Sequence, residues 1–131
     1  MELSSKLYAI KKQLSFTQSL KDFKDETSQL NDIQKAFHQF DQIGKDNKKW
    51  IFMSNKIVEI GKLEKGYLKC KAYIPISKMR LSAKRGARLY LAINHTSKIV
   101  ILVSIMPKTK IATGGKKDLS EKKENNLFRE C

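Results

Sequence analysis

Positive charge and strand-like sequence coincide in one segment of this chain. Residues 61–110 hold twelve Lys or Arg residues and a single acidic one, Glu64, so this segment supplies +11 of the formal net charge of +14. Apolar runs that are typical of strands are threaded through it, for example at residues 89–93 and 99–106. A folded sheet with so many cations favours a polyanionic partner, because Lys and Arg bind RNA or DNA phosphates with release of counterions.

The alternation within residues 68–74 predicts a strand with one apolar and one cationic face. The apolar face comprises Leu68, Cys70, Ala72 and Ile74, and the other face comprises Lys69, Lys71 and Tyr73. We therefore expect Cys70 to be buried and inert. With Cys131 as its only fellow cysteine, it indicates no disulfide framework.

Two helical patterns precede the basic segment. A short strand within residues 8–16 is followed by a helix capped by Thr17, and Asn31 and Asp32 can cap a second helix that ends at Gly44. The second helix has the i, i+3, i+4, i+7 spacing of a stripe that packs on a core. Its apolar stripe comprises Ile33, Ala36, Phe37, Phe40 and Ile43.

Extended patterns dominate after residue 50. The predicted elements are an extended segment at 50–60, strands at 88–93 and 98–106 joined by a turn at 94–97, and a short helix that starts within 118–121. A long basic loop at 75–85 separates the strand at 68–74 from the next one.

Together these elements predict a single α+β domain over residues 1–131. We expect a small antiparallel sheet of about four strands, with the two N-terminal helices packed on one face and a short C-terminal helix. The cations should lie on the other face of the sheet or at one end of it. The ends, residues 1–11 and 121–131, are expected to fray.

Composition excludes several other classes of protein. The 131 residues are 40% hydrophobic and 31% charged, which is typical of a soluble globular domain. No apolar run approaches the roughly 18 residues of a membrane span, and the N-terminus lacks a signal-peptide pattern, so we expect a cytoplasmic protein with no membrane partner. No spacing links His38, His95 and the cysteines into a metal site, so neither a metal nor another cofactor is expected.

Residues 69–120 resemble the RelE/ParE toxin superfamily, and within it the HigB/RelE-like toxins of type II toxin–antitoxin modules. The resemblance lies in a Lys-x-Lys strand, a glycine loop closed by Arg, a Lys-rich turn after the last strand and an Asp-Leu-Ser start to a final helix. The matching runs are Lys69-Cys70-Lys71, Lys84-Arg85-Gly86-Ala87-Arg88, Pro107-Lys108-Thr109-Lys110 and Asp118-Leu119-Ser120. The order of elements resembles that family from about residue 12 onward.

The resemblance implies a ribosome-dependent mRNA endonuclease that an antitoxin holds inactive. In that family a 2′-hydroxyl attacks the adjacent phosphate, which needs a proton acceptor, cations on the phosphate and a proton donor for the leaving oxygen. The residues carried over as catalytic are Lys69, Lys71, Arg88 and Lys108. The expected RNA-binding residues are Lys78, Arg80, Lys84, Arg85 and Lys110, with Tyr73 and Tyr90 as candidates for base stacking. Lys78 and Arg80 form a second Lys-x-Arg pattern, which leaves the register of the motif open.

Two departures from the family pattern leave other functions open. Ala87 replaces the second loop glycine, and no Tyr or His follows His95, so the usual late acid is missing. The alternatives are a non-catalytic or ParE-like, gyrase-poisoning toxin of the same fold, and a plain RNA-binding protein. The expected partners are mRNA, the ribosome and an antitoxin whose acidic or amphipathic segment covers the basic face.

Overall fold

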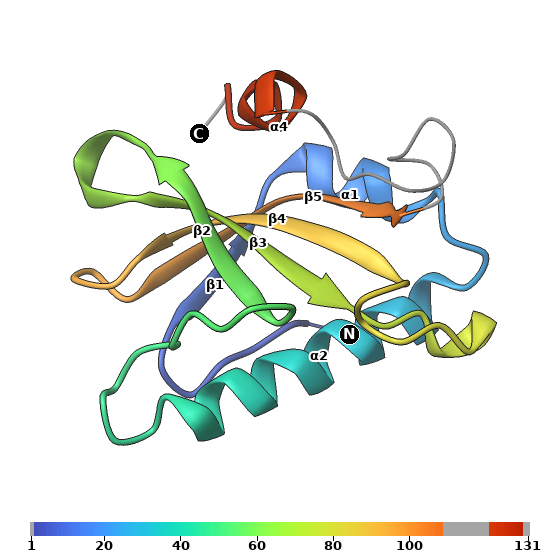
Figure 1. Ribbon diagram of the computed structural model, residues 1–131, viewed down its shortest axis with the longest axis horizontal. Helices are drawn as coiled ribbons and strands as arrows, with labels where there is room; N and C mark the ends of the chain where they lie inside the picture. The colour runs from blue at the N-terminus through green and yellow to red at the C-terminus, as the bar shows by residue number, and fades with distance from the viewer. Residues whose placement is uncertain (1, 109–120, 130–131) are drawn as a thin grey trace.

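One five-stranded sheet forms the centre of the molecule, with α2 along one face and α4 on the opposite side (Figure 1). The computed structural model describes residues 2–108 and 121–129. The elements are β1 (Ala9–Lys12), α1 (Leu14–Leu20), α2 (Glu26–Ile43), β2 (Ile57–Lys62), β3 (Leu68–Ile74), β4 (Ala87–Asn94), β5 (Ile99–Pro107) and α4 (Glu121–Leu127), with two short 3-10 turns, η1 (Glu64–Gly66) and η2 (Ser77–Met79). The predicted α+β class is confirmed.

The sheet has five strands where about four are predicted, and the short strand predicted within residues 8–16 is present as β1. Its order is β1-β5-β4-β3-β2, in which the last four strands are antiparallel neighbours, as expected. The fifth strand, β1, pairs in parallel with β5, from Ala9 beside Ile99 to Lys12 beside Leu102. The extended segment predicted at residues 50–60 is a strand only from Ile57, since the residues before it form a turn closed by a bridge between Met53 and Ile57.

Helix α1 continues the edge of β5 where β1 ends. Its serines at positions 15 and 19 lie four residues apart, on one side of the helix, and face the β5 backbone. The Ser15 hydroxyl donates to the Val103 carbonyl at 2.6 Å, and the Ile105 N–H donates to the Ser19 hydroxyl at 2.9 Å. The two serine hydroxyls thus form hydrogen bonds with backbone groups of β5 that lie beyond the end of β1.

Both N-terminal helices begin earlier than predicted. Helix α1 follows Gln13 directly, so Thr17 lies inside it. Helix α2 is capped by Asp25, whose carboxylate accepts from the Ser28 N–H at 3.0 Å, and not by Asn31 or Asp32. Asp32 is buried within the helix, and its two oxygens accept from the N–H and hydroxyl of Ser77 in η2. A residue typical of caps is used here for a tertiary contact. Gly44 ends α2, as expected.

The apolar stripe of α2 packs on the sheet together with residues from the chain's start. Ile33, Ala36, Phe37 and Phe40 are buried as predicted, whereas Ile43 is 42% exposed. Trp50 lies against Phe37, Phe40 and Tyr8, with ring centroids 4.9–5.3 Å apart. The apolar residues on that side of β3 and β4 complete this core, as the alternation in β3 predicts.

The N-terminal segment, part of which is expected to fray, is bonded to the side chain of Asp41 in α2 and packs against Trp50. The Asp41 carboxylate accepts from the Ser5 hydroxyl at 2.6 Å, the Lys6 N–H at 2.8 Å and the Trp50 indole N–H at 2.9 Å. The Tyr8 hydroxyl accepts from the Trp50 N–H at 3.0 Å, and burial raises the pKa of Tyr8 to about 12. This polar network attaches the N-terminal segment to the C-terminal half of α2.

The loop before β4 depends on a glycine that approaches the backbone closely. A Cβ on Gly86 would lie 2.4 Å from the Ile74 carbonyl oxygen and 2.9 Å from the Ser82 carbonyl oxygen. Both atoms belong to the backbone, so neither can move without displacing β3 or the loop. Ala87, which stands where the resembled family has its second glycine, lies in β4 and needs no left-handed conformation.

Gly86→Ala should therefore lower the free energy of unfolding by about 1–3 kcal/mol, as overpacking does. Chemical denaturation followed by circular dichroism measures the change. Gly61→Ala is the matched control, because its Cβ would meet only the flexible Lys69 side chain, 3.3 Å away. Equal stability of the two variants would contradict the close approach at Gly86.

Candidate nucleic-acid interface

The outward face of β3 and β4, opposite α2, carries the side chains that the sequence predicts for it. Lys69, Lys71 and Tyr73 point to this face, and the strand register places Tyr90 beside Lys71 and Arg88 beside Tyr73. Two of the four predicted catalytic residues, Lys71 and Arg88, are buried there. Their surroundings show what each of them does.

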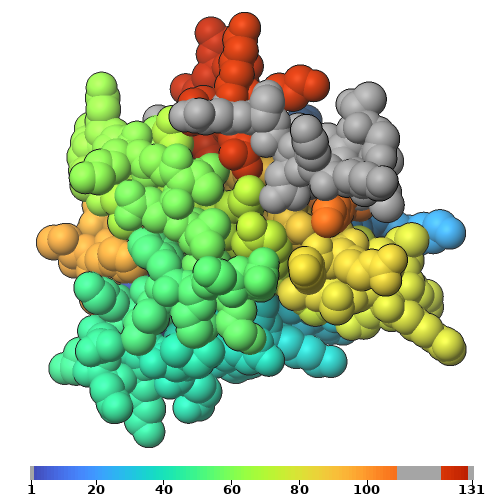
Figure 2. Space-filling view, viewed as in Figure 1, coloured from blue at the N-terminus to red at the C-terminus, as the bar shows by residue number. Residues whose placement is uncertain are grey.

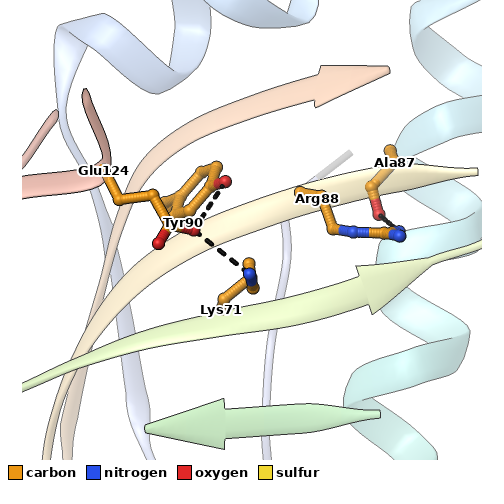
Figure 3. Close-up of polar contacts among 5 residues, drawn as sticks. All are labelled: Lys71, Ala87, Arg88, Tyr90 and Glu124. Carbon is orange, nitrogen blue, oxygen red and sulfur yellow. Dashed lines mark hydrogen bonds and ion pairs between the residues drawn. The ribbon is translucent and has the colours of Figure 1, made fainter. Parts of the chain in front are cut away.

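The charge of Lys71 is neutralised by Glu124 of α4, which packs on the outward face of the sheet. The Glu124 carboxylate accepts from the Lys71 ammonium and from the Tyr90 hydroxyl, both at 3.1 Å. Figure 3 shows the two side chains pointing toward Glu124 from neighbouring strands. All three residues are at least nine-tenths buried, so an ion pair with good geometry is needed to offset their desolvation. In this conformation Tyr90 presents no ring face to a stacked base.

Arg88 holds the loop that precedes its own strand. Its guanidinium donates to the carbonyl oxygens of Ala83 at 3.1 Å, Lys84 at 2.7 Å and Ala87 at 3.3 Å, the last drawn in Figure 3. It also lies 4.2 Å from the centroid of the Tyr73 ring. With 2% of its surface exposed, Arg88 stabilises the basic loop from inside, and burial argues against a direct contact with phosphate in this conformation.

The other two predicted catalytic lysines are more accessible. Lys69 is half-buried, donates to the Asn125 side-chain oxygen at 3.0 Å and lies 5.9 Å from the centroid of the Phe128 ring. Lys108 is half-buried just after β5, where its N–H donates to the Gly86 carbonyl at 2.8 Å. Lys110 and residues 118–120 lie outside the described residues.

A cleft with a volume of about 840 Å³ opens between η1, the outward face of β3 and α4. Four cations and one carboxylate line it, together with two aromatic rings and a side-chain amide. These charged, aromatic and amide residues are Lys62, Lys65, Lys69 and Arg129, Glu64, Tyr67 and Phe128, and Asn125. A volume of a few hundred to about 1,000 Å³ suits a nucleotide-sized ligand. Cations with an exposed ring are the usual means of gripping single-stranded nucleic acid.

Most residues of the cleft are absent from the predicted site. Lys62, Lys65 and Tyr67 do belong to the basic segment, but they flank a turn and follow no strand alternation, so nothing in the pattern distinguishes them. Asn125 and Arg129 belong to the segment expected to fray. Only the packing of α4 against β3 brings the two groups together.

The remaining predicted RNA-binding residues lie elsewhere. Lys78, Arg80, Lys84 and Arg85 are exposed on the basic loop, away from the cleft lining. Lys78 lies 3.7 Å from the Asp25 carboxylate in a solvent-exposed pair, which contributes little to stability. Tyr73 is half-buried beneath Arg88 and lines a separate cavity of about 280 Å³ beside α2.

Other kinds of site find little support among the described residues. No group of three or more His, Cys, Asp or Glu residues there could hold a metal ion. Cys70 is buried, and burial raises the pKa of its thiol, so it stays protonated and unreactive, as predicted. No helix in this part of the chain is long and apolar enough to cross a membrane.

Comparisons with known proteins give one structural similarity. No protein-family model and no curated protein match this sequence. Among solved structures, the fold is similar to a chain in the complex of archaeal RelE and RelB from Pyrococcus horikoshii OT3. The identity is 13%, the TM-score is 0.44, and the alignment covers 77% of this chain and 94% of that chain. An identity and a TM-score this low assign neither a family nor a function.

Glu124→Gln should release α4 from the sheet. The substitution removes the carboxylate charge that pairs with the buried Lys71 ammonium, and breaking a buried ion pair costs about 3–5 kcal/mol where no relaxation is possible. Undocking of α4 is the easier relaxation, so we expect amide hydrogen exchange at residues 122–128 to accelerate by about tenfold or more.

In that experiment the amides of β3 and β4 should keep their protection. Lys122→Gln is the control, because Lys122 is exposed on the same helix. Unchanged exchange in α4 of the Glu124→Gln protein would show that the buried pair does not hold the helix.

Proposed function

We propose that this protein is an RNA-binding toxin of a toxin–antitoxin pair that acts on mRNA at the ribosome. The sequence resemblance to RelE-like toxins suggests the biological role, and the cationic cleft beside α4 supports the choice of RNA as ligand. The antitoxin would be an acidic or amphipathic segment that covers the basic surface, since charge complementarity favours that partner.

The proposal that the ligand is RNA rests on the charge, size and aromatic lining of the cleft. Four cations face one carboxylate in a space large enough for a nucleotide, and the half-buried Tyr67 ring lines it. Phosphate oxygens would bind Lys62, Lys65 and Arg129, while a base stacks on Tyr67. Such stacking does not depend on base identity, because every base has an aromatic face. A cleft of this kind suits unpaired RNA better than a rigid duplex.

We also propose that the protein cleaves the bound RNA strand. Lys69 is the catalytic candidate best placed for cleavage, because it lines the cleft and keeps donors beyond the one used on Asn125. Lys71 and Tyr90 lie next to it but are occupied by Glu124.

Binding without cleavage is the second candidate function. It is favoured by the internal bonds of Lys71 and Arg88, which give two of the four predicted catalytic residues a structural task. An RNA-binding protein of this kind would occlude mRNA and leave it intact. The two candidates share the cleft and differ only in what happens to the strand.

The cleft proposal predicts how RNA affinity depends on salt. Each phosphate contact to single-stranded RNA contributes about −0.7 to the slope of log K against log salt. Replacing Lys62, Lys65 and Arg129 together by Gln should therefore make the slope shallower by about 2 units. Fluorescence anisotropy with a labelled single-stranded RNA of about 12 nucleotides measures it.

Two further variants separate the contribution of stacking and of overall charge from that of the cleft cations. Tyr67→Leu should weaken binding by about 1–3 kcal/mol with little change in slope, because stacking releases no counterions. Lys11, Lys21 and Lys35, all exposed and outside the cleft lining, replaced together by Gln, provide a control of equal charge change. If this control loses as much affinity and slope as the cleft variant, binding is diffuse and the cleft is not the site.

The toxin proposal predicts growth arrest on induced expression, with new transcript ends if the strand is cut. Lys69→Met should abolish the new ends while keeping the alkyl chain packed near Phe128. Arg88→Ala is a poor probe, because it also releases three carbonyls of the basic loop. Arrest with intact transcripts supports the second candidate, and normal growth with wild-type protein refutes the toxin role.

A further inference from the structure

Three loops that are far apart in the sequence meet at the end of the sheet next to the cleft. The Asn94 side chain, at the start of the turn between β4 and β5, donates to the Lys65 carbonyl of η1 at 3.0 Å. On the other side of the turn, the Lys98 ammonium donates to the Lys48 carbonyl in the loop after α2. Figures 1 and 2 show the hairpin turn (orange) between the green surface around η1 and the teal surface after α2.

Lysines occupy strained backbone positions in each of these loops. Lys48, Lys65 and Lys98 have φ angles of 55°, 61° and 59°, the left-handed region that favours glycine or asparagine. Among the described residues, the only other non-glycine positions with positive φ are Asn55 and Arg80. A lysine in this conformation costs about 1 kcal/mol relative to glycine. The presence of lysine at all three of these adjoining turns favours a role for the side-chain charge in binding an anionic ligand.

The charges at this end are not neutralised within the described part of the chain. No ion pair of those residues involves Lys48, Lys49, Lys65 or Lys98. The pKa of His95, in the same turn, is lowered by burial and further by the nearby charges of Lys49 and Lys98. With its pKa below the usual value, His95 is mainly neutral at pH 7. The charges at this end are the ammonium groups and the Glu59 carboxylate, whose nearby charge acts in the opposite direction on the pKa of His95.

We propose that an RNA strand held in the cleft continues over this end of the sheet and binds a second set of phosphates on Lys48, Lys49 and Lys98. We call these three residues the hairpin-end strip. Lys65 connects the two regions, because its side chain lines the cleft while its carbonyl is bound to the hairpin turn. The inference rests on the proposed function and adds that the ligand is a single strand longer than the cleft alone can hold.

Glycine substitutions separate the charge of the strip from the stability of the fold. Lys48→Gly and Lys98→Gly remove cations and relieve the left-handed backbone. This relief offsets the loss of the Lys98 bond to the Lys48 carbonyl and of its contact with the Tyr8 ring, so with Lys49→Gln the melting temperature should stay close to that of wild type. Asn55→Gly is the matched backbone control, since Asn55 has a φ of 62° and carries no charge. The Lys11, Lys21 and Lys35 triple Gln protein remains the control for charge.

The test compares single-stranded RNAs of about 4 and about 12 nucleotides, the range of site sizes seen for single-strand binders. The strip variant should lose about tenfold in affinity for the longer RNA and about 2 units of salt slope, since three phosphate contacts are lost. Its affinity for the shorter RNA should stay within about twofold of wild type. The cleft variant should lose affinity for both lengths.

Each result has a distinct meaning. If the strip variant binds the longer RNA as wild type does, or loses affinity equally for both lengths, the strip is not a separate contact region, although cleft binding stands. If wild-type protein binds neither RNA, the proposed function fails first, and the strip inference falls with it.

Discussion

Strand β4 is buried along its whole length, so each of its polar side chains needs a partner inside the fold. Every residue from Ala87 to Asn94 is buried, although this strand alternates apolar residues with Arg88, Tyr90 and Asn94. A strand with polar side chains on one face can be covered on both faces only if those side chains find partners. Helix α2 supplies an apolar cover on one side, and α4 supplies a cover with a carboxylate on the other.

The cations accordingly fall into two groups, those that are buried with partners and those that are accessible to solvent. Lys71 is buried under α4, and Arg88 is buried against the loop before β4. Desolvation there requires an opposite charge or several carbonyls, and each residue has such partners. Lys62 ends β2, and Lys65 and the lysines of the hairpin-end strip lie on turns at the rim. All of them are exposed except Lys98, which is half-buried. The high positive charge of the segment is thus partly structural, and most of the cations that we propose to bind RNA lie around the strand faces and not on them.

Much of the fold follows from local pattern. The bounds and facing of β3, the hairpin of β4 and β5, the stripe of α2 and the end of that helix at Gly44 are all predicted, because strand alternation and helix periodicity are properties of a few consecutive residues. Strand β1 shows the limit of such reasoning. A weakly alternating stretch gives some sign of a strand, but its parallel pairing with β5, about ninety residues away, depends on contacts that no local pattern contains.

Charge and strand alternation in the sequence predict an α+β domain with cations on one face of its sheet, and they favour a polyanionic partner. Only the tertiary structure decided which cations remain available to that partner. Helix α4 pairs Glu124 with Lys71, the loop carbonyls take Arg88, and three distant loops bring rim lysines together. The physical reason is that the availability of a charge depends on its desolvation and its neighbours, and both are set by elements far away in the sequence.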